Sequence, residues 1–376
     1  MTMLRRWTAR AAAFVLVAAA LVAGGSATTA GAKSKVPGLQ FLGQAIVPTG
    51  TTFAGTTVGG LSSITYDAKR GVYYAISDDQ VGVRFYTLRI DVSDGSLASG
   101  DVQLTAVTTF KGADGQPFAP QTVDPEGLVL TKAGTLVATS EGFPNRFIDP
   151  WLREFSLQGS QLRALNVPAP FLPNATGTRG VRLNLGFESA GVPPNGRFLF
   201  SATEGALVQD GPAAGIATRS PARLLRYNLQ TGKLDRQWLY WTEPIAEPPV
   251  PPTNFAVNGI VEVLPLNNEH LLTMERSFSV GAPDTGNTIK LFSVKVTGAT
   301  NVNGADSLAG RLDSIRPVQK TLLLDFDTLG IPLDNVEGMT LGPKLPDGRQ
   351  SLVLVSDNNF AAAQFTQFLL FAIPKK

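Results

Sequence analysis

Apolar and polar residues alternate along most of the chain in short runs separated by turns rich in glycine, proline, asparagine and aspartate. The stretch from 123 to 142, VDPEGLVLTKAGTLVATSEG, is typical: two apolar runs are joined by a tight turn, Lys132-Ala133-Gly134. Short runs bounded by turn residues are typical of β-strands, whereas helices need longer segments with a period of 3.6. The pattern therefore predicts an all-β fold.

The same unit recurs five times along the chain. Each copy has a first strand, a glycine-containing turn or a polar loop, a second strand that ends near an acidic residue, and a third strand rich in aromatic or large apolar residues. A fourth apolar segment follows every copy except the last, and the segment LQFLGQAIVP stands ahead of the first copy. Repeated four-stranded sheets whose last member is completed from the N-terminus are typical of a β-propeller, a fold that leaves no sheet edge open. We therefore predict a propeller closed by an N-terminal strand.

The number of blades follows from the repeat. The copies are spaced by about 60 to 80 residues, against roughly 40 to 50 for common propeller repeats, so long inserted loops are expected. Five blades is the direct count, and a sixth, degenerate blade hidden in an insertion is one alternative. A β-sandwich or two unrelated β domains is the other. We expect residues 33–376 to form one propeller domain.

The N-terminal segment differs from the rest of the chain. Three arginines, Arg5, Arg6 and Arg10, precede an apolar run, and Ala30-Gly31-Ala32 provides a small-residue cleavage site. These features predict a secretory signal peptide over residues 1–32. The apolar run is short compared with the roughly 20 residues of a membrane span, so a retained anchor is the less favoured interpretation. We expect a secreted, periplasmic or cell-envelope protein whose mature chain has no membrane span.

Charge and cysteine content limit the classes of partner and of metal site that we expect. The formal charge of +2 includes the three arginines of the predicted signal peptide, so the mature chain carries about −1. A near-neutral chain lacks the basic surface that nucleic-acid binding needs, and no nucleic-acid partner is expected. The absence of cysteine excludes disulfides and thiolate metal sites, and in an exported protein it suits a bacterial origin. We expect a monomer.

Carboxylates occupy matching positions in the repeat. The start of the first strand carries Ser62, Glu126, Glu188, Asn258 and Glu337, and the end of the second strand carries Asp78, Glu141, Glu204, Glu275 and Asp357. Because the two strands are antiparallel neighbours, the start of one and the end of the other lie at the same edge of a blade. In a propeller these edges surround one axis, so we expect eight carboxylates to converge on the central channel.

Eight carboxylates in one funnel need compensation, because like charges at short range raise one another's pKa. The candidates are a divalent cation, for which Ca²⁺ with its six to eight oxygen ligands is the first choice, and arginines such as Arg276 and Arg146. The predicted metal ligands are Asp78, Glu141, Glu188, Glu204, Glu275 and Asp357. The alternative is structural, because strand-end carboxylates also form turns and accept backbone hydrogen bonds from the next blade.

Other common catalytic sites find no support in the sequence. His270 is the only histidine, which argues against a Ser-His-Asp triad and against a histidine-ligated zinc site. A G-x-S-x-G nucleophile motif and a glycine-rich phosphate loop are also missing from the sequence. The carboxylate ring is therefore the main candidate site.

An ordered set of motifs resembles a known family. GGLSSITYDAKRGVYYAISDD, DPEGL with SEG, GFES with ATEG, MERSF, and NVEGM with SDNNF follow one another over nearly all of the predicted mature chain. Together they resemble the bacterial phytase-like family, also called esterase-like activity of phytase. The resemblance implies a secreted β-propeller with a hydrolase activity on esters or phosphoesters, and it marks the acidic ring as a family signature.

Two functions follow from these observations. The first is a metal-assisted hydrolase of small-molecule phosphoric or carboxylic esters, in which Glu126 or Glu337 acts as general base and Arg276 or Arg146 stabilises negative charge. The second is a non-catalytic binding propeller of the cell envelope, in which the ring holds a structural ion.

Overall fold

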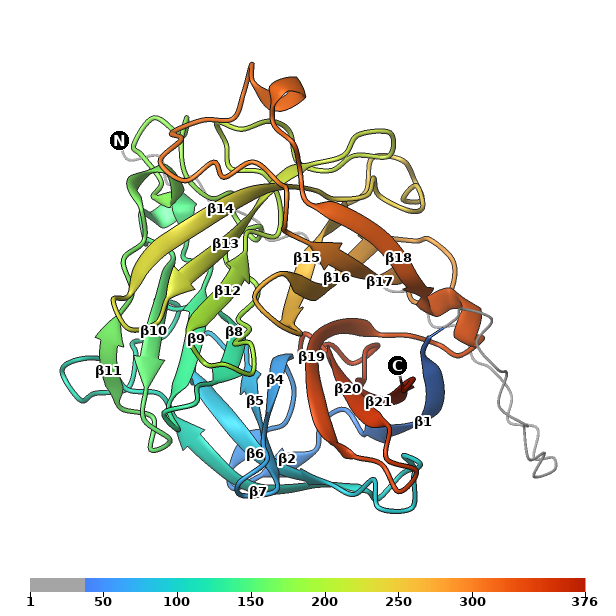
Figure 1. The fold of residues 1–376 in the computed structure, drawn as a ribbon. Coiled ribbons are helices and arrows are strands. Elements are labelled where there is room, and N and C mark those ends of the chain that lie inside the picture. The colour runs from blue at the N-terminus through green and yellow to red at the C-terminus, as the bar shows by residue number, and fades with distance from the viewer. Residues whose placement is uncertain (1–37, 376) are drawn as a thin grey trace, which may run out of the picture. The chain divides into compact units, whose positions relative to one another are not determined.

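The computed structural model describes residues 38–375, and the predicted signal peptide lies outside them. The described residues form five sheets arranged as the blades of a propeller (Figure 1). Four of the blades follow the chain in order. Their strands are, in blade 1, β4 (Leu61–Asp67), β5 (Val72–Ser77), β6 (Arg84–Ile90) and β7 (Val102–Thr109); in blade 2, β8 (Pro125–Leu130), β9 (Leu136–Ser140), β10 (Trp151–Phe155) and β11 (Gln161–Ala164); in blade 3, β12 (Phe198–Ala202), β13 (Pro221–Asn228) and β14 (Lys233–Trp241); and in blade 4, β15 (Ala256–Pro265), β16 (His270–Ser279), β17 (Asn287–Lys295) and β18 (Gln319–Asp325).

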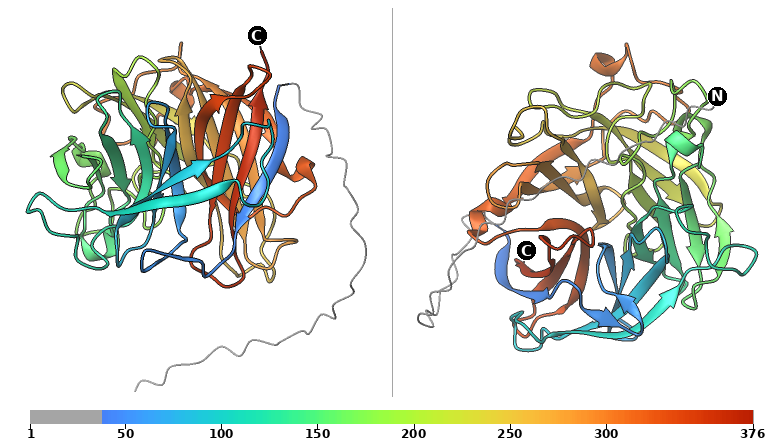
Figure 2. Two further views of the ribbon diagram at one scale, coloured as in Figure 1. Left: turned by 90° about the horizontal axis from the view of Figure 1, so that it is seen from below. Right: turned by 180° about the vertical axis from the view of Figure 1, so that it is seen from behind.

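Blade 5 joins the two ends of the described chain. It consists of β19 (Asn335–Lys344), β20 (Gln350–Asp357), β21 (Thr366–Ile373) and the N-terminal strand β1 (Gln40–Val47). Strand β1 runs antiparallel to β21 from the pair Gln40–Ala372 to the pair Val47–Thr366, and both views of Figure 2 show the blue strand beside the red ones. The five-bladed fold and its closure by an N-terminal strand are therefore confirmed.

Blade 3 departs from the predicted repeat. Its innermost segment, predicted as a strand beginning at Glu188, makes only isolated bridges, one between Phe187 and Thr203 and one between Gly191 and Phe200. Proline lacks the N–H group that a continuous ladder requires, and two prolines, Pro193 and Pro194, follow in this segment. The inner edge of blade 3 is therefore irregular where the other blades have a regular strand.

Apolar side chains lie mainly between neighbouring blades. Each of the five blade interfaces has its own buried cluster, for example Tyr74 and Phe85 of blade 1 against Leu128 and Phe155 of blade 2. Aromatic residues of the third strands, such as Phe85, are fully buried in these clusters. The core therefore forms a ring around the axis and leaves the centre to the innermost strands.

The short remaining elements lie outside the blades. They are the hairpin β2 (Thr52–Phe53) and β3 (Thr56–Thr57) and four single-turn 3₁₀ helices, η1 (Pro144–Arg146), η2 (Ala169–Phe171), η3 (Leu312–Ser314) and η4 (Phe326–Leu329). Within residues 38–375, no helix has the length and apolar character needed to cross a membrane.

Candidate active site: an acidic cavity at the propeller axis

The innermost segments of the five blades surround a cavity of about 470 Å³, which we call the acidic cavity. Eight carboxylates and one guanidinium, that of Arg276, line it. The carboxylates belong to Asp78, Asp124, Glu126, Glu141, Glu188, Glu204, Glu337 and Asp357. Seven of these eight are residues that the repeat predicts at this edge, so the sequence locates most of the ring.

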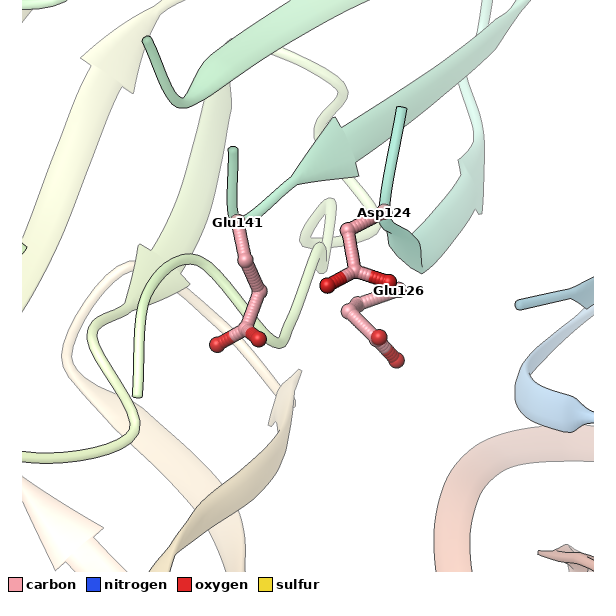
Figure 3. A group of neighbouring side chains, drawn as sticks. All are labelled: Asp124, Glu126 and Glu141. Carbon is pink, nitrogen blue, oxygen red and sulfur yellow. The ribbon is translucent and has the colours of Figure 1, made fainter. Parts of the chain in front are cut away.

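The blade geometry explains how each hairpin contributes its acids. In blade 2 the Glu141 N–H donates to the Asp124 carbonyl at 3.1 Å, which sets the end of β9 beside the start of β8. The register of β8 against β9 shifts between Pro125 and Leu128. A bulge of this kind redirects a side chain at the sheet edge. Figure 3 shows the result: the carboxylates of Asp124, Glu126 and Glu141 all extend into the same open space.

A second group of carboxylates lies beside the first. Oxygens of Glu141, Glu188 and Glu204 are all within 4.8 Å of one another, as are those of Asp124, Glu126 and Glu141. Glu141 belongs to both groups and also accepts a hydrogen bond from the Gly186 N–H. The two clusters therefore form one continuous arc across blades 2 and 3.

Burial and mutual repulsion raise the pKa of these acids. Burial, opposed in part by hydrogen bonds, raises the pKa of Glu141 to about 8. Burial also raises the pKa of Glu204 to about 7, although Arg276 opposes this shift. The pKa values of Glu126 and Glu188 are raised well above the usual range, first by burial and then by neighbouring carboxylates. The arrangement therefore disfavours ionisation of all the carboxylates at once.

Arg276 is the one guanidinium in the lining. Its Nη2 donates to Glu337 at 2.8 Å and lies 3.5 Å from Glu204, so it connects acids of blades 3 and 5. Its Nε atom is buried and has no hydrogen-bond partner among the described residues. Arg276 therefore neutralises only part of the acidic charge and keeps one donor free.

Two predicted site residues lie elsewhere. Glu275 points between blades 3 and 4, where its carboxylate accepts hydrogen bonds from the Tyr240 hydroxyl and the Lys320 ammonium, each at 2.7 Å. Adjacent residues of a strand face opposite sides, and in β16 it is Arg276 that faces the axis. The prediction that Glu275 converges with the ring is therefore wrong by one position.

Arg146 is also absent from the lining of the acidic cavity. It belongs to the single turn η1, in the loop between β9 and β10 of blade 2, where its Nη1 donates to the Gln121 carbonyl at 2.6 Å and its guanidinium lies over the Phe143 ring. These contacts hold an exposed loop and do not bring Arg146 to the carboxylates.

Comparison with known families identifies the chain. A model of the family described as "Phytase-like: Esterase-like activity of phytase" matches residues 56–360. The chain belongs to this family. The matched range includes all eight carboxylates and Arg276, so the phytase-like family model covers every charged residue of the acidic cavity. A comparison with curated proteins gives no match.

Solved structures similar to this phytase-like protein share little sequence with it. An endo-arabinase from Bacteroides thetaiotaomicron is 11% identical over 88% of this chain and 97% of its own, with a TM-score of 0.43. A GH43_12 protein retrieved from a capybara gut metagenome is 9% identical over 87% of this chain and 53% of its own, with a TM-score of 0.41. The β-propeller domain of Cps50 (Swd1) from Myceliophteria thermophila is 12% identical over 85% and 98%, with a TM-score of 0.33. At these TM-scores the similarities say nothing about activity.

The donor set of the phytase-like cavity fits a hard divalent cation. Carboxylate oxygens are the ligands that Ca²⁺ and Mg²⁺ prefer, and neither histidine nor cysteine lines the cavity. Glu204 is 2% exposed, and its Oε1 has no hydrogen-bond partner within the described chain. The Nη2 atom of Arg276 lies 3.5 Å from this oxygen. Glu141, Glu188 and Glu204 are therefore the residues best placed to hold a cation.

Sequence reasoning missed several residues of the lining. Asp124 lies two positions before Glu126 in the DPEG motif and so outside the two repeat columns, yet it contributes the eighth carboxylate. Asn335 has the equivalent place in the NVEG motif of blade 5, and its Nδ2 donates to Glu337 at 2.9 Å. A comparison of the residues two positions before each glutamate would have found both.

Proposed function

We propose that this phytase-like propeller is a hydrolase of small-molecule carboxylic or phosphoric esters, with its active site in the acidic cavity and with Ca²⁺ as cofactor. The observation that carries the proposal is the cluster of Glu141, Glu188 and Glu204, whose oxygens lie within 4.8 Å of one another beside a single guanidinium. The family description, esterase-like activity, supports the same reaction class. Secretion into the medium or the cell envelope stays a prediction from the N-terminal segment.

A bound divalent cation would stabilise the negative charge that develops on an ester oxygen. Glu126 is the first candidate for the general base. It faces the cavity, none of the described residues donates a hydrogen bond to its carboxylate, and burial raises its pKa well above the usual range. A carboxylate with a raised pKa is a stronger base once it is ionised, and a cation in the cavity would favour the ionised form. Glu337 is less suited, because Arg276 and Asn335 both donate to it.

Arg276 has the second role. Its contact with Glu337 fixes the guanidinium at the cavity wall, and its unpartnered Nε is a donor for an oxygen that gains negative charge. Arg146, which lies away from the cavity, is not part of this proposal.

The test is a hydrolysis screen of the purified protein with chromogenic acyl esters and phosphate esters, with Ca²⁺ and with EDTA. We expect turnover that EDTA abolishes and Ca²⁺ restores. Glu126→Gln should lower kcat by at least about 100-fold, as expected for loss of a general base, while Glu269→Gln, an exposed control in blade 4, should not change it. Turnover that survives both EDTA and Glu126→Gln would contradict the mechanism.

A second function, a non-catalytic binding propeller with a structural ion, is favoured by one observation. Glu141 accepts from the Gly186 N–H of the next blade, and the Asp357 carboxylate accepts from the Asn359 N–H at 2.7 Å. Such bonds hold backbone in place. A large rise in thermal stability on adding Ca²⁺, with no turnover of any ester in the screen, would favour this function.

A further inference from the structure

The lining of the acidic cavity has one apolar side. Three apolar residues line it: Val257 of β15 and Phe278 of β16 belong to the hairpin of blade 4, and Phe255 directly precedes β15. We call them the apolar wall. The rings of Phe255 and Phe278 are 6.3 Å apart, so the wall is one contiguous surface.

The strand register places the wall directly beyond the guanidinium. In the pairing of β15 with β16, Gly259 lies opposite Arg276, and Val257 lies opposite Phe278. Residues two apart on a strand face the same side and are separated by roughly 7 Å. Phe278 therefore stands next to Arg276 on the axial face, one step farther from the carboxylates of blades 3 and 5 that Arg276 contacts.

The wall is open to water and continues into its surroundings. Phe255 is 63% exposed, and two more apolar residues, Val250 at 60% and Val280 at 37%, are exposed beside it. Backbone hydrogen bonds join these segments: the Val280 N–H donates to the Phe255 carbonyl at 3.0 Å, and the Val250 N–H donates to the Val280 carbonyl at 2.9 Å. Exposed apolar groups gathered at a cavity mouth mark a surface that an apolar ligand group can cover.

The charge of the cavity limits which ligand carries that group. Eight carboxylates face one guanidinium, and one divalent cation would offset only two negative charges, so a substrate with several phosphates meets repulsion from the carboxylates that remain ionised. A neutral ester meets none, and an apolar acyl chain attached to it would reach the wall when its ester group is near Arg276.

We propose that the substrates are neutral carboxylic esters with an apolar acyl group, and that the apolar wall binds this group. The inference rests on the proposed hydrolase function and narrows it to carboxylic esters. In the reaction, the oxygen of water bonds to the acyl carbon, the bond from that carbon to the alcohol oxygen breaks, and the alcohol leaves with one proton of the water, so that the products are a carboxylic acid and an alcohol.

The experiment compares 4-nitrophenyl esters of acetic, butyric, hexanoic and octanoic acid. Each methylene group that is buried against the wall should raise kcat/KM by up to about fourfold, and we expect at least a tenfold rise from acetyl to hexanoyl. The double variant Phe255→Ser with Val257→Thr should remove this dependence on chain length. The matched control is Phe147→Ser, a phenylalanine that is 65% exposed and lies outside the lining, and it should keep the dependence.

A binding measurement separates this inference from the proposed function. Saturation-transfer NMR with acetamide, butanamide and hexanamide, which carry the same acyl groups, needs no turnover. If no ester is hydrolysed but hexanamide binds more strongly than acetamide and the double variant abolishes the difference, the wall is supported and the hydrolase proposal fails. If esters are hydrolysed with no dependence on chain length, or if the double variant keeps the dependence, the wall is overturned and the hydrolase proposal stands.

Discussion

At the scale of single residues, Glu188 shows most directly how the charges of the site are balanced. Its carboxylate contacts both Glu141 and Glu204, and its pKa is raised by burial and then by these neighbours. Repulsion of this kind is tolerated only when a proton or a cation is shared within the group. Under the proposed function, the same carboxylate therefore costs stability in the metal-free protein and would contribute affinity for the cation.

This double role gives a prediction for Glu188→Gln. In the absence of metal at pH 8, the variant should be more stable than the wild type by about 1 kcal/mol, a common size for a single substitution, because a neutral amide is not repelled by the neighbouring carboxylates. On addition of Ca²⁺ the variant should gain less thermal stability than the wild type. Calorimetric unfolding with EDTA and with Ca²⁺ measures both effects.

The control for this variant is Glu269→Gln, which removes one charge from an exposed turn of blade 4. It should leave both quantities unchanged. A variant Glu188→Gln that is less stable than the wild type without metal would show that Glu188 is a structural hydrogen-bond acceptor instead.

The residue scale also shows where sequence reasoning ends. The repeat predicts Asp78, Glu141, Glu204 and Asp357 at the cavity, and they are there. It fails at the Glu275-Arg276 pair, because a strand turns neighbouring residues to opposite faces and the sequence alone does not fix the register of the hairpin. Only the strand register, in which Gly259 pairs with Arg276, shows which of the two residues faces the axis.

At the scale of elements, the innermost strands are joined by a buried carboxyl group. Glu262 of β15 is 1% exposed. Its carboxyl accepts from the Ser63 hydroxyl of blade 1 at 2.8 Å and from the Val263 N–H of its own strand at 2.9 Å. It thereby connects blades 1 and 4 at the centre, and the backbone N–H groups of Met339 and Ala190 help to oppose the rise that burial causes in its pKa. Sequence reasoning missed this residue, since it is outside the repeated columns.

Removing this carboxyl group should loosen the centre of the propeller. Glu262→Ala removes the acceptor of two buried donors, the Ser63 hydroxyl and the Val263 N–H, each costing about 1 to 3 kcal/mol, so we expect the free energy of unfolding to fall by about 2 kcal/mol or more. Urea unfolding followed by fluorescence measures the loss. The matched control Glu269→Ala, on the exposed turn that follows β15, should cost less than about 0.5 kcal/mol. Equal stabilities of the two variants would show that the centre does not depend on Glu262.

The element scale also separates what the pattern of the chain can predict from what it cannot. Short apolar runs and a fixed order of motifs are local signals, and they give the strands, the five blades and the closing role of β1. The inner edge of blade 3 is irregular because prolines interrupt the ladder of hydrogen bonds. The repeat does not reveal this irregularity, since Glu188 keeps its place in the pattern and still reaches the cavity. Contacts between blades, such as those of Glu262, depend on packing at the axis and leave no periodic signal.

At the scale of the whole molecule, the acidic cavity should make stability depend on pH and on metal. Folding raises the pKa of Asp124 to about 6, of Asp78 and Glu204 to about 7, and of Glu141 to about 8, in each case first through burial. The folded state therefore binds these protons more tightly than the unfolded chain, in which the ordinary pKa is 3.8 for aspartate and 4.5 for glutamate. The contribution of these protons to the free energy of unfolding is fully present below about pH 4 and is lost as the pH rises through 6 to 8.

The last prediction follows from the upward direction of these pKa shifts. With EDTA present, the free energy of unfolding should fall by about 3 kcal/mol or more between pH 5 and pH 8, since each unit of pKa shift corresponds to about 1.4 kcal/mol and several acids contribute. Surface pairs such as Asp347 with Arg349, where hydrogen bonds lower the pKa of the carboxyl, act in the opposite direction but only below pH 4, so the interval from 5 to 8 isolates the buried acids. With Ca²⁺ at millimolar concentration the decline should shrink or vanish, because a cation takes the place of the shared protons. Urea unfolding across this interval with EDTA and with Ca²⁺ measures both curves, and a flat curve in EDTA would show that the acids of the cavity are ionised at no cost and that the site has no need of a cation.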